Sequence, residues 1–459
     1  MPTLDERYLE FRDATAEVFT AIPELEPLRF FLFKELLVAK RGAGLAGALK
    51  HWARRAWVLG RLEERASHPV GDVLLLVDGR RDVAVEPILA VHAQLQALGT
   101  LSVIASFRGP EELPGPVIRF AAEALGRIPA WAKRGWDALS SVQPLLAQRR
   151  LRQAFEIQAR AVAGLFAAAQ RLLDRVRPAV LVNASNNTVA GATLVMAARG
   201  RAIPSLLLQH GIPQAFYTPL LNDSMLTWGL RSSDALVRLG VPAAKLRVIG
   251  SPRHDRFLRV KVGEARRRLL RTHGLSDRVT LVYFSNGNDL QRNGVGPAAA
   301  VEWLERAAAR VPGVNVLARL HPNEDGSLFA SSRKIVVMKR EVDVVTALAG
   351  ADIVASQCST ALEEAVLLGK PVWQFEGDGW PELASNWRDG LAARVGSASE
   401  LVSLLEAALA GTLAGRCDAR LVDWLFANRG RAAEVAAATI AQLIERRGSC
   451  DAVASEGAP

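Results

Sequence analysis

Cysteine is scarce in this chain of 459 residues. Its three cysteines, Cys358, Cys417 and Cys450, are widely spaced and odd in number. This pattern gives neither a disulfide framework nor the spacing of a metal site, so a reducing cytoplasm is the simplest expectation. The length and a hydrophobic fraction of 50% suit two or three globular domains that fold without disulfide bonds.

Long apolar runs are missing as well. No run approaches the length that spans a bilayer, and residues 1–10 are too polar for a secretory signal, so we expect a cytoplasmic protein. Residues 29–59 combine aromatic with basic side chains, as interfacial membrane helices do. Their leucines also fit the core stripe of a helix packed on its own domain. Peripheral contact with the inner face of the cell membrane therefore stays an open alternative.

Signatures of nucleic-acid binding are absent. The chain carries 57 Lys+Arg against 47 Asp+Glu, a formal charge of +10, which suits nucleic acid, an anionic membrane or phosphorylated substrates. Because no zinc-finger spacing or RNA-binding signature accompanies this charge, we expect no nucleic-acid partner. The chain also has no Asp-x-Asp element, and we expect no metal ion.

What the chain does contain is two series of short apolar runs that alternate with helical segments. An arginine-rich helix at 264–272 separates the two series. Apolar runs bounded by polar residues predict buried strands of parallel sheets. We predict strands of a first sheet at 72–79, 101–107, 179–184, 204–210, 224–229 and 246–250, and of a second sheet at 279–287, 315–321, 334–339, 352–356 and 371–375.

The predicted fold class is therefore α/β, with two doubly wound, Rossmann-like domains that face each other across a cleft. The pattern divides the chain into a helical amino-terminal extension (1–65), a first domain (66–258) with a helical insertion (116–177), a second domain (259–445) and a disordered tail (446–459).

Open α/β sheets bind ligands at the carboxyl ends of their strands, and polar residues stand at these ends. His210 and Gly211 follow one strand of the first domain, while Asn286 and Gly287 end the first strand of the second. An imidazole at the position of His210 could take a proton from a substrate hydroxyl. The alternative is a structural histidine.

Two further strand ends lie in the second domain. Arg319 and His321 could contact a diphosphate and its nucleoside, or the histidine could simply face a loop. Ser359 or Thr360 stands at a helix N-cap, where free N–H groups and hydroxyls suit a phosphate. The carboxylates that would complete a capping box are Glu363 or Glu364, and the whole pattern could be no more than a cap.

The segment Gly250-Ser-Pro-Arg-His-Asp255 joins the two halves of the chain. Our preferred interpretation is a hinge ion pair between Arg253 and Asp255. A phosphate contact of Arg253 is the alternative.

These motifs resemble those of bacterial GT-B-fold transferases of surface-polymer biosynthesis. His210-Gly-Ile-Pro213 is similar to the His-Gly-Thr-Pro element of CDP-glycerol glycerophosphotransferases, whose histidine is regarded as the general base. Arg319-Leu-His-Pro322 is similar to that family's Arg-x-His-Pro element, and the segment from 250 to 255 to its Gly-Tyr-Pro-Arg-Asn-Asp. Related elements occur in capsule sialyl- and Kdo-transferases, which use CMP-sugars.

One motif departs from the glycerophosphotransferase pattern. That family has Thr-Asp-Tyr-Ser-Ser where this chain has Ser356-Gln-Cys-Ser-Thr360. The run that follows is more similar to sugar-nucleotide GT-B enzymes and to the non-hydrolysing sugar-nucleotide 2-epimerases, whose Glu residues here hold the nucleoside ribose. The departure favours a sugar over glycerol phosphate as the transferred group.

The resemblance implies an inverting, metal-independent glycosyltransferase, which moves a sugar from a CMP-, CDP- or UDP-activated donor to a cell-surface glycan or lipid-linked acceptor. No cofactor is expected, because the nucleotide sugar is a substrate. His210 would be the general base. The donor phosphates and ribose would be held by Arg319, His321, Ser359, Thr360, and Glu363 or Glu364.

Three alternatives stay open. The first is a CDP-glycerol-type glycerophosphotransferase. The second is a UDP-sugar 2-epimerase, although that family's full set of catalytic acids cannot be identified in this chain. The third is a non-catalytic GT-B scaffold that binds membranes or partner enzymes through its amino-terminal helices.

Overall fold

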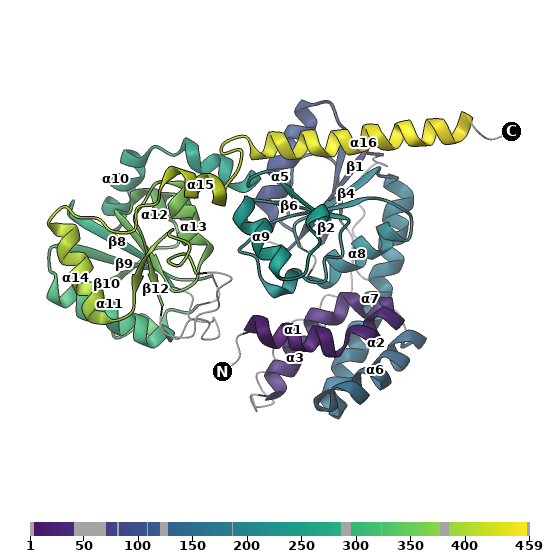
Figure 1. The fold of residues 1–459 in the computed structure, drawn as a ribbon, viewed down its shortest axis with the longest axis horizontal. Helices are drawn as coiled ribbons and strands as arrows, with labels where there is room; N and C mark the ends of the chain where they lie inside the picture. Colours follow the sequence, from purple (N-terminus) through teal and green to yellow (C-terminus); the bar gives the residue numbers. More distant parts are fainter. Residues whose placement is uncertain are drawn as a thin grey trace.

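The computed structural model describes residues 4–40, 70–79, 82–107, 109–119, 127–185, 187–285, 295–322, 324–376 and 385–456. Two parallel sheets, each with helices on both faces, form two domains that lie side by side (Figure 1). The prediction of two doubly wound domains is confirmed. The site candidates Asn286 and Gly287 lie outside the described residues.

The first sheet has seven parallel strands in the order β3-β2-β1-β4-β5-β6-β7. Because helices cover both faces, its central strands are apolar along their whole length instead of alternating with polar residues. The strands are β1 (Val73–Asp78), β2 (Ser102–Phe107), β3 (Val117–Arg119), β4 (Val180–Asn183), β5 (Ser205–Leu208), β6 (Ser224–Thr227) and β7 (Leu246–Val248).

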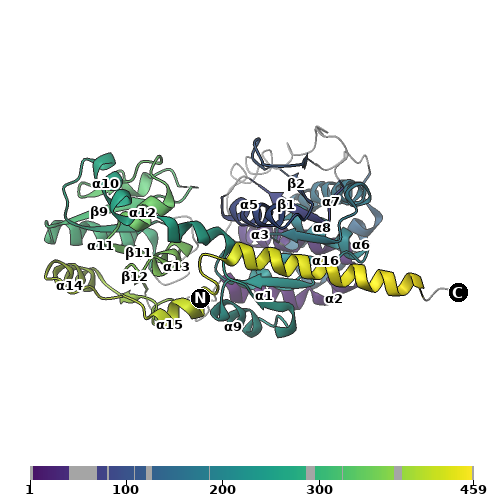
Figure 2. The ribbon, with the colours of Figure 1, turned by 90° about the horizontal axis from the view of Figure 1, so that it is seen from above.

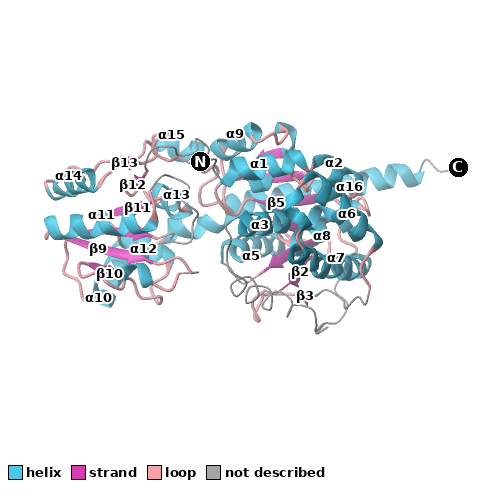
Figure 3. Ribbon diagram, turned by 90° about the horizontal axis from the view of Figure 1, so that it is seen from below, coloured by secondary structure: helices cyan, strands magenta, loops and turns pink. Residues whose placement is uncertain are grey.

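Helices from distant parts of the chain cover this sheet (Figure 3). One face packs against α5 (Asp82–Ala97) and α16 (Ala432–Glu456), and the other against α7 (Arg149–Val176) and α8 (Val189–Arg199). The predicted helical insertion at 116–177 contains strand β3 at its start. A three-residue edge strand is too short to give a periodic signal, which is why the sequence did not predict it.

A helical layer packs outside the first sheet and joins the amino terminus to the insertion. Its apolar core also takes in Leu207 of β5 and Met225 of β6. The elements of the layer are α1 (Leu4–Ala14), α2 (Ala16–Ala21), η1 (Pro23–Leu28), α3 (Arg29–Lys40), α6 (Ala130–Val142), η2 (Pro144–Ala147) and the first half of α7.

The aromatic run of α3 belongs to this core. Phe31 and Phe33 are buried, and Phe30 packs against Phe216 with ring centroids 4.7 Å apart. In the described part of the run, the aromatic residues therefore pack within the protein, as the amphipathic alternative predicted. Residues 41–69 lie outside the described residues. Among the described helices, none has both the length and the apolar character that a membrane span requires.

The second sheet has six parallel strands in the order β10-β9-β8-β11-β12-β13. They are β8 (Val279–Phe284), β9 (Val314–Arg319), β10 (Ile335–Val337), β11 (Ile353–Ser356), β12 (Val372–Phe375) and β13 (Ala393–Val395). Helices α11 (Pro297–Arg310) and α14 (Ala398–Leu409) cover one face, and α10 (Val262–His273), α12 (Val344–Gly350), α13 (Thr360–Leu367) and α15 (Ala419–Leu425) cover the other.

The chain crosses between the domains twice. The first crossing is η5 (Pro252–Arg259), and the second follows α15, where the Ala427 N–H donates to the Trp228 carbonyl at 2.8 Å. Helix α16 then runs back along the first domain (Figure 2), with Ala436 and Ile440 in its core. The first domain is therefore completed by the end of the chain, and α16 continues past 446, the predicted start of a disordered tail.

Candidate functional site

The carboxyl end of β5 is fixed by the buried side chain of Gln209. Its Oε1 accepts from the Trp228 backbone N–H at 2.8 Å, and its Nε2 donates to the Gly211 carbonyl and to Ser232 Oγ, both at 2.9 Å. These bonds hold the backbone on both sides of His210. A Cβ at Gly211 would meet nothing within 4 Å, so open space adjoins this turn.

The His210 imidazole is partly exposed beside this open space. The Tyr217 hydroxyl lies 3.3 Å from His210 Nδ1. Burial lowers the pKa of His210 to about 4, an effect that Arg253 reinforces and a hydrogen bond to the Ala184 backbone opposes. The ring is therefore neutral at pH 7, the state in which an imidazole can accept a proton.

Helix α1 anchors the segment that carries Tyr217. The Tyr8 hydroxyl donates to the Thr218 carbonyl at 2.7 Å, and Asp5 Oδ1 accepts from the Ala215 backbone N–H at 2.9 Å. Arg12 Nη1 adds a bond to Thr218 Oγ1 at 2.8 Å. The amino-terminal helices thus hold η3 (Ala215–Tyr217) in place from outside the sheet.

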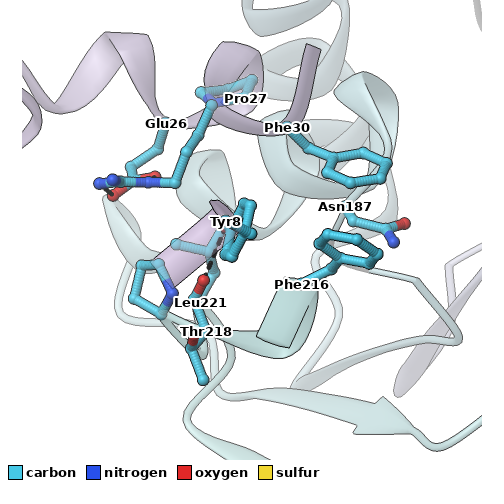
Figure 4. Close-up of a pocket in the computed structure, with 10 residues that line it drawn as sticks. Tyr8, Glu26, Pro27, Phe30, Asn187, Phe216, Thr218 and Leu221 are labelled. Atoms are coloured by element: carbon cyan, nitrogen blue, oxygen red, sulfur yellow. Dashed lines mark hydrogen bonds and ion pairs between the residues drawn. The ribbon is translucent and has the colours of Figure 1, made fainter. Parts of the chain in front are cut away.

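A small cavity lies at this junction (Figure 4). Phe30 and Phe216 form one wall, and Asn187 and an ion pair of Glu26 with Arg29 lie nearby. Its volume is about 20 Å³. This is room for a single water molecule and not for a nucleotide or sugar.

The Arg253 guanidinium joins the two domains. Its Nε donates to Glu86 on α5 and its Nη1 contacts Glu364 on α13, both at 2.9 Å. Asp255 instead accepts from the backbone N–H groups of Ala432 and Ala433. The preferred prediction of a hinge ion pair between Arg253 and Asp255 was therefore wrong, because each residue has other partners.

Glu364 is buried beside Arg253 and His254 of the joining segment. Besides Arg253, His254 lies with its Nε2 3.1 Å from Glu364 Oε1. Burial alone would raise the pKa of the Glu364 carboxyl, but Arg253 and His254 outweigh this effect and hold the pKa below its usual range. Glu364 is therefore a charged group at neutral pH.

Its neighbour Glu363 is also buried and pairs with Arg231 on α9 (Leu230–Arg238), which contacts Asp389 at 2.7 Å as well. Burial raises the pKa of Glu363, and the positive charge of Arg231 offsets only part of this rise. Both glutamates reach toward the first domain and not back to their own helix N-terminus. The predicted capping box is therefore absent, although its N-cap is present.

That N-cap is Ser359, whose Oγ accepts from the Ala361 backbone N–H at 3.2 Å. Ser359 and Thr360 are both partly exposed. Their hydroxyls stand at the start of α13, one turn before the paired glutamates. The strand, polar turn and helix predicted for this segment are confirmed.

Arg319 ends β9, where its guanidinium donates to the Val342 carbonyl and lies close enough to Asp343 and Glu364 to interact with both charges. The His321 backbone N–H donates to Glu324 Oε2 at 2.6 Å. The other carboxylate oxygen of Glu324 accepts from Ser285 Oγ at 2.7 Å. Glu324 thus ties the ends of β8 and β9 together.

The structure brings several of the predicted site residues together. Arg253 influences the His210 ring and contacts Glu364, and Glu364 interacts with Arg319. These interactions link residues of both domains. The His321 backbone lies beside Glu324, which also accepts from Ser285.

Sequence reasoning missed four polar residues of this region: Tyr217, Arg231, Glu324 and Asp389. Arg231 follows the strand end at Trp228, so the rule that selected His210 could have found it. Tyr217 and Asp389 lie in segments without periodic pattern. Among the described residues, no group of three or more His, Cys, Asp or Glu side chains is arranged to hold a metal ion.

No protein-family model matches the chain, and a search among curated proteins gives no match. Solved structures do resemble it. UDP-GlcNAc 2-epimerase from Methanocaldococcus jannaschii, in complex with UDP-GlcNAc and UDP, is 15% identical with a TM-score of 0.55, over 81% of this chain and 99% of that one.

Two further structures agree. UDP-GlcNAc 2-epimerase from Neisseria meningitidis bound to UDP-GlcNAc is 15% identical with a TM-score of 0.51, over 82% of this chain and 100% of that one. The S. aureus MnaA–UDP co-structure is 13% identical with a TM-score of 0.50, over 79% of this chain and 94% of that one.

These structures overturn the prediction of a glycosyltransferase and support its 2-epimerase alternative. The glycan or lipid-linked acceptor is withdrawn with it. The motifs misled because a strand-end histidine and a helix N-cap suit any nucleotide-sugar site and do not distinguish transfer from epimerisation. At this identity the likeness establishes the fold: two Rossmann-like domains with a GT-B-like arrangement and a helical amino-terminal region.

Proposed function

We propose that the chain is an enzyme acting on a UDP-activated sugar and that it inverts the sugar at C2. The observation that carries this proposal is the fold match over 99% of a 2-epimerase whose structure contains UDP-GlcNAc and UDP. The interactions of Arg253 with His210 and with Glu364 support it further, because they link predicted site residues of both domains.

Inversion at C2 requires that the C2–H bond break and form again on the opposite face. The C2 proton of a pyranose is not acidic, so its loss is coupled to departure of the nucleoside diphosphate from C1, which leaves a C1–C2 double bond. Return of the diphosphate to the same face of C1, and of a proton to the opposite face of C2, gives the C2 epimer. The site must therefore move protons and retain UDP.

The residues present supply groups for both tasks. Neutral His210 can exchange a proton near the sugar. Arg319 and the Ser359 and Thr360 hydroxyls can hold the diphosphate at the start of α13. Glu363 or Glu364 can accept hydrogen bonds from the ribose hydroxyls, as the resemblance to 2-epimerases implies.

The test offers the purified protein UDP-GlcNAc in D₂O without any acceptor. We expect conversion to the C2 epimer, with deuterium entering at C2, measured by ¹H NMR. His210→Ala is expected to lower turnover by about 10²-fold or more while UDP affinity stays within a factor of about three. Absence of both epimer and deuterium incorporation, in protein that binds UDP, would refute the proposal.

A further inference from the structure

We propose that Tyr217 is a positioning residue that fixes His210 in one neutral tautomer, with the proton on Nε2. The role of His210 in turnover rests on the proposed function above, whereas the geometry of the pair does not. Neither the predicted motifs nor the resemblance assigned any part to Tyr217.

The first step concerns the direction of the hydrogen bond between the two side chains. Hydrogen bonds from the backbone of His210 and Gly211 oppose the rise of the Tyr217 pKa, an effect that requires N–H groups that donate to the phenol oxygen. An oxygen that already accepts these bonds turns its own proton elsewhere, and His210 Nδ1 lies 3.3 Å away. Tyr217 is therefore the donor and Nδ1 the acceptor.

The second step concerns the other ring nitrogen. A neutral imidazole carries one proton, and when Nδ1 accepts, that proton is on Nε2. The Ala184 backbone, at the end of β4, is the partner that a ring N–H can donate to. Both ring nitrogens are thus assigned, one by Tyr217 of η3 and the other by the end of β4.

The third step concerns rigidity. Tyr217 is 5% exposed, and Tyr8, Asp5 and Arg12 of α1 bond the backbone or side chains on both sides of it. Gln209 fixes the turn that carries His210. Two separately anchored segments therefore hold the Tyr217 hydroxyl and the His210 ring at a fixed position relative to each other. Fixing one tautomer requires this rigidity.

The test compares Tyr217→Phe with Tyr283→Phe. Each variant removes one buried tyrosine hydroxyl, but only the first removes the partner of His210, because the Tyr283 hydroxyl donates to Gln357 in the second domain. The readouts are the ¹⁵N shifts of the His210 ring, assigned by their loss in His210→Gln, and the pH dependence of turnover of UDP-GlcNAc.

In Tyr217→Phe we expect the ring to become a mixture of tautomers. Its pKa should rise because a bond to the neutral form is lost. The acid limb of the kcat profile should move to higher pH, and kcat should fall by about tenfold to a hundredfold with little change in KM. Tyr283→Phe should leave the His210 tautomer and the pH profile as in the wild-type protein.

An unchanged His210 spectrum in folded Tyr217→Phe would overturn the proposal, and so would equal effects of the two variants. If the tautomer of His210 changes but kcat does not, Tyr217 has no role in turnover. If the wild-type protein neither binds nor converts UDP-GlcNAc, the proposed function fails. The ring spectra then still decide whether Tyr217 positions His210.

Discussion

At the scale of single residues, His210 combines a lowered pKa with a position beside open space. Its position was predictable, because a polar residue that ends an apolar run marks the edge where open sheets bind ligands. Its partners were not. Tyr217 is seven residues away in an aperiodic loop, and Arg253 approaches only through tertiary folding.

The lowered pKa of His210 also predicts how stability depends on pH. The unfolded ring gains a proton near pH 6.5, and the folded ring only near pH 4. Its stabilising effect is therefore complete above pH 6.5 and is lost as the pH falls toward 4, by at most about 3 kcal/mol. Burial lowers the pKa of His92 and His254 as well, so they act in the same direction.

Urea unfolding at several pH values checks this. The free energy of unfolding should fall less steeply between pH 7 and 4.5 in His210→Gln than in the wild-type protein. Parallel curves for the two proteins would contradict the placement of a neutral His210.

At the scale of elements, most strands were predictable because a strand covered on both faces is a short, continuous apolar run. The exceptions were β3 and β13, three-residue edge strands that only pairing with a neighbour defines. The pairing of α16 with α5 was not predictable either, since nothing in a helical pattern says which domain it covers.

Asp255 offers a test of how α16 is attached. It lies in η5 yet accepts from the first N–H groups of α16, Ala432 and Ala433, at 3.1 and 2.8 Å. Asp255→Ala should therefore destabilise the protein by about 1 kcal/mol, as loss of a helix cap does, and Asp255→Asn by less. Denaturant midpoints measure both, and equal effects of the two substitutions would count against a capping role.

At the scale of the whole molecule, buried ion pairs join the domains. Arg231 of α9 pairs with Glu363 of α13, and Arg253 bridges Glu86 and Glu364. Side-chain rings cross the same boundary, with Trp228 stacked on Phe426 at 5.5 Å. No sequence pattern predicted these contacts, because each partner lies more than a hundred residues from the other.

Removing one member of such a pair leaves the other buried and unpaired. Arg231→Met should therefore destabilise the protein by about 3 kcal/mol or more. The double variant Arg231→Met with Glu363→Leu should recover most of the loss, because apolar side chains of similar size replace the pair. A double-mutant cycle in urea measures the coupling, and strictly additive effects would mean that the two side chains do not interact in solution.

The return of α16 to the first domain also has a consequence for synthesis. A ribosome releases the first domain's strands early, but one face of their sheet has to wait for residues 432–440 before it is covered. During that interval Val73, Leu75 and Val182 lack part of their final packing. The nascent chain should therefore depend on chaperones until termination, and a stop codon before α16 should give an insoluble product although it removes none of the candidate site residues.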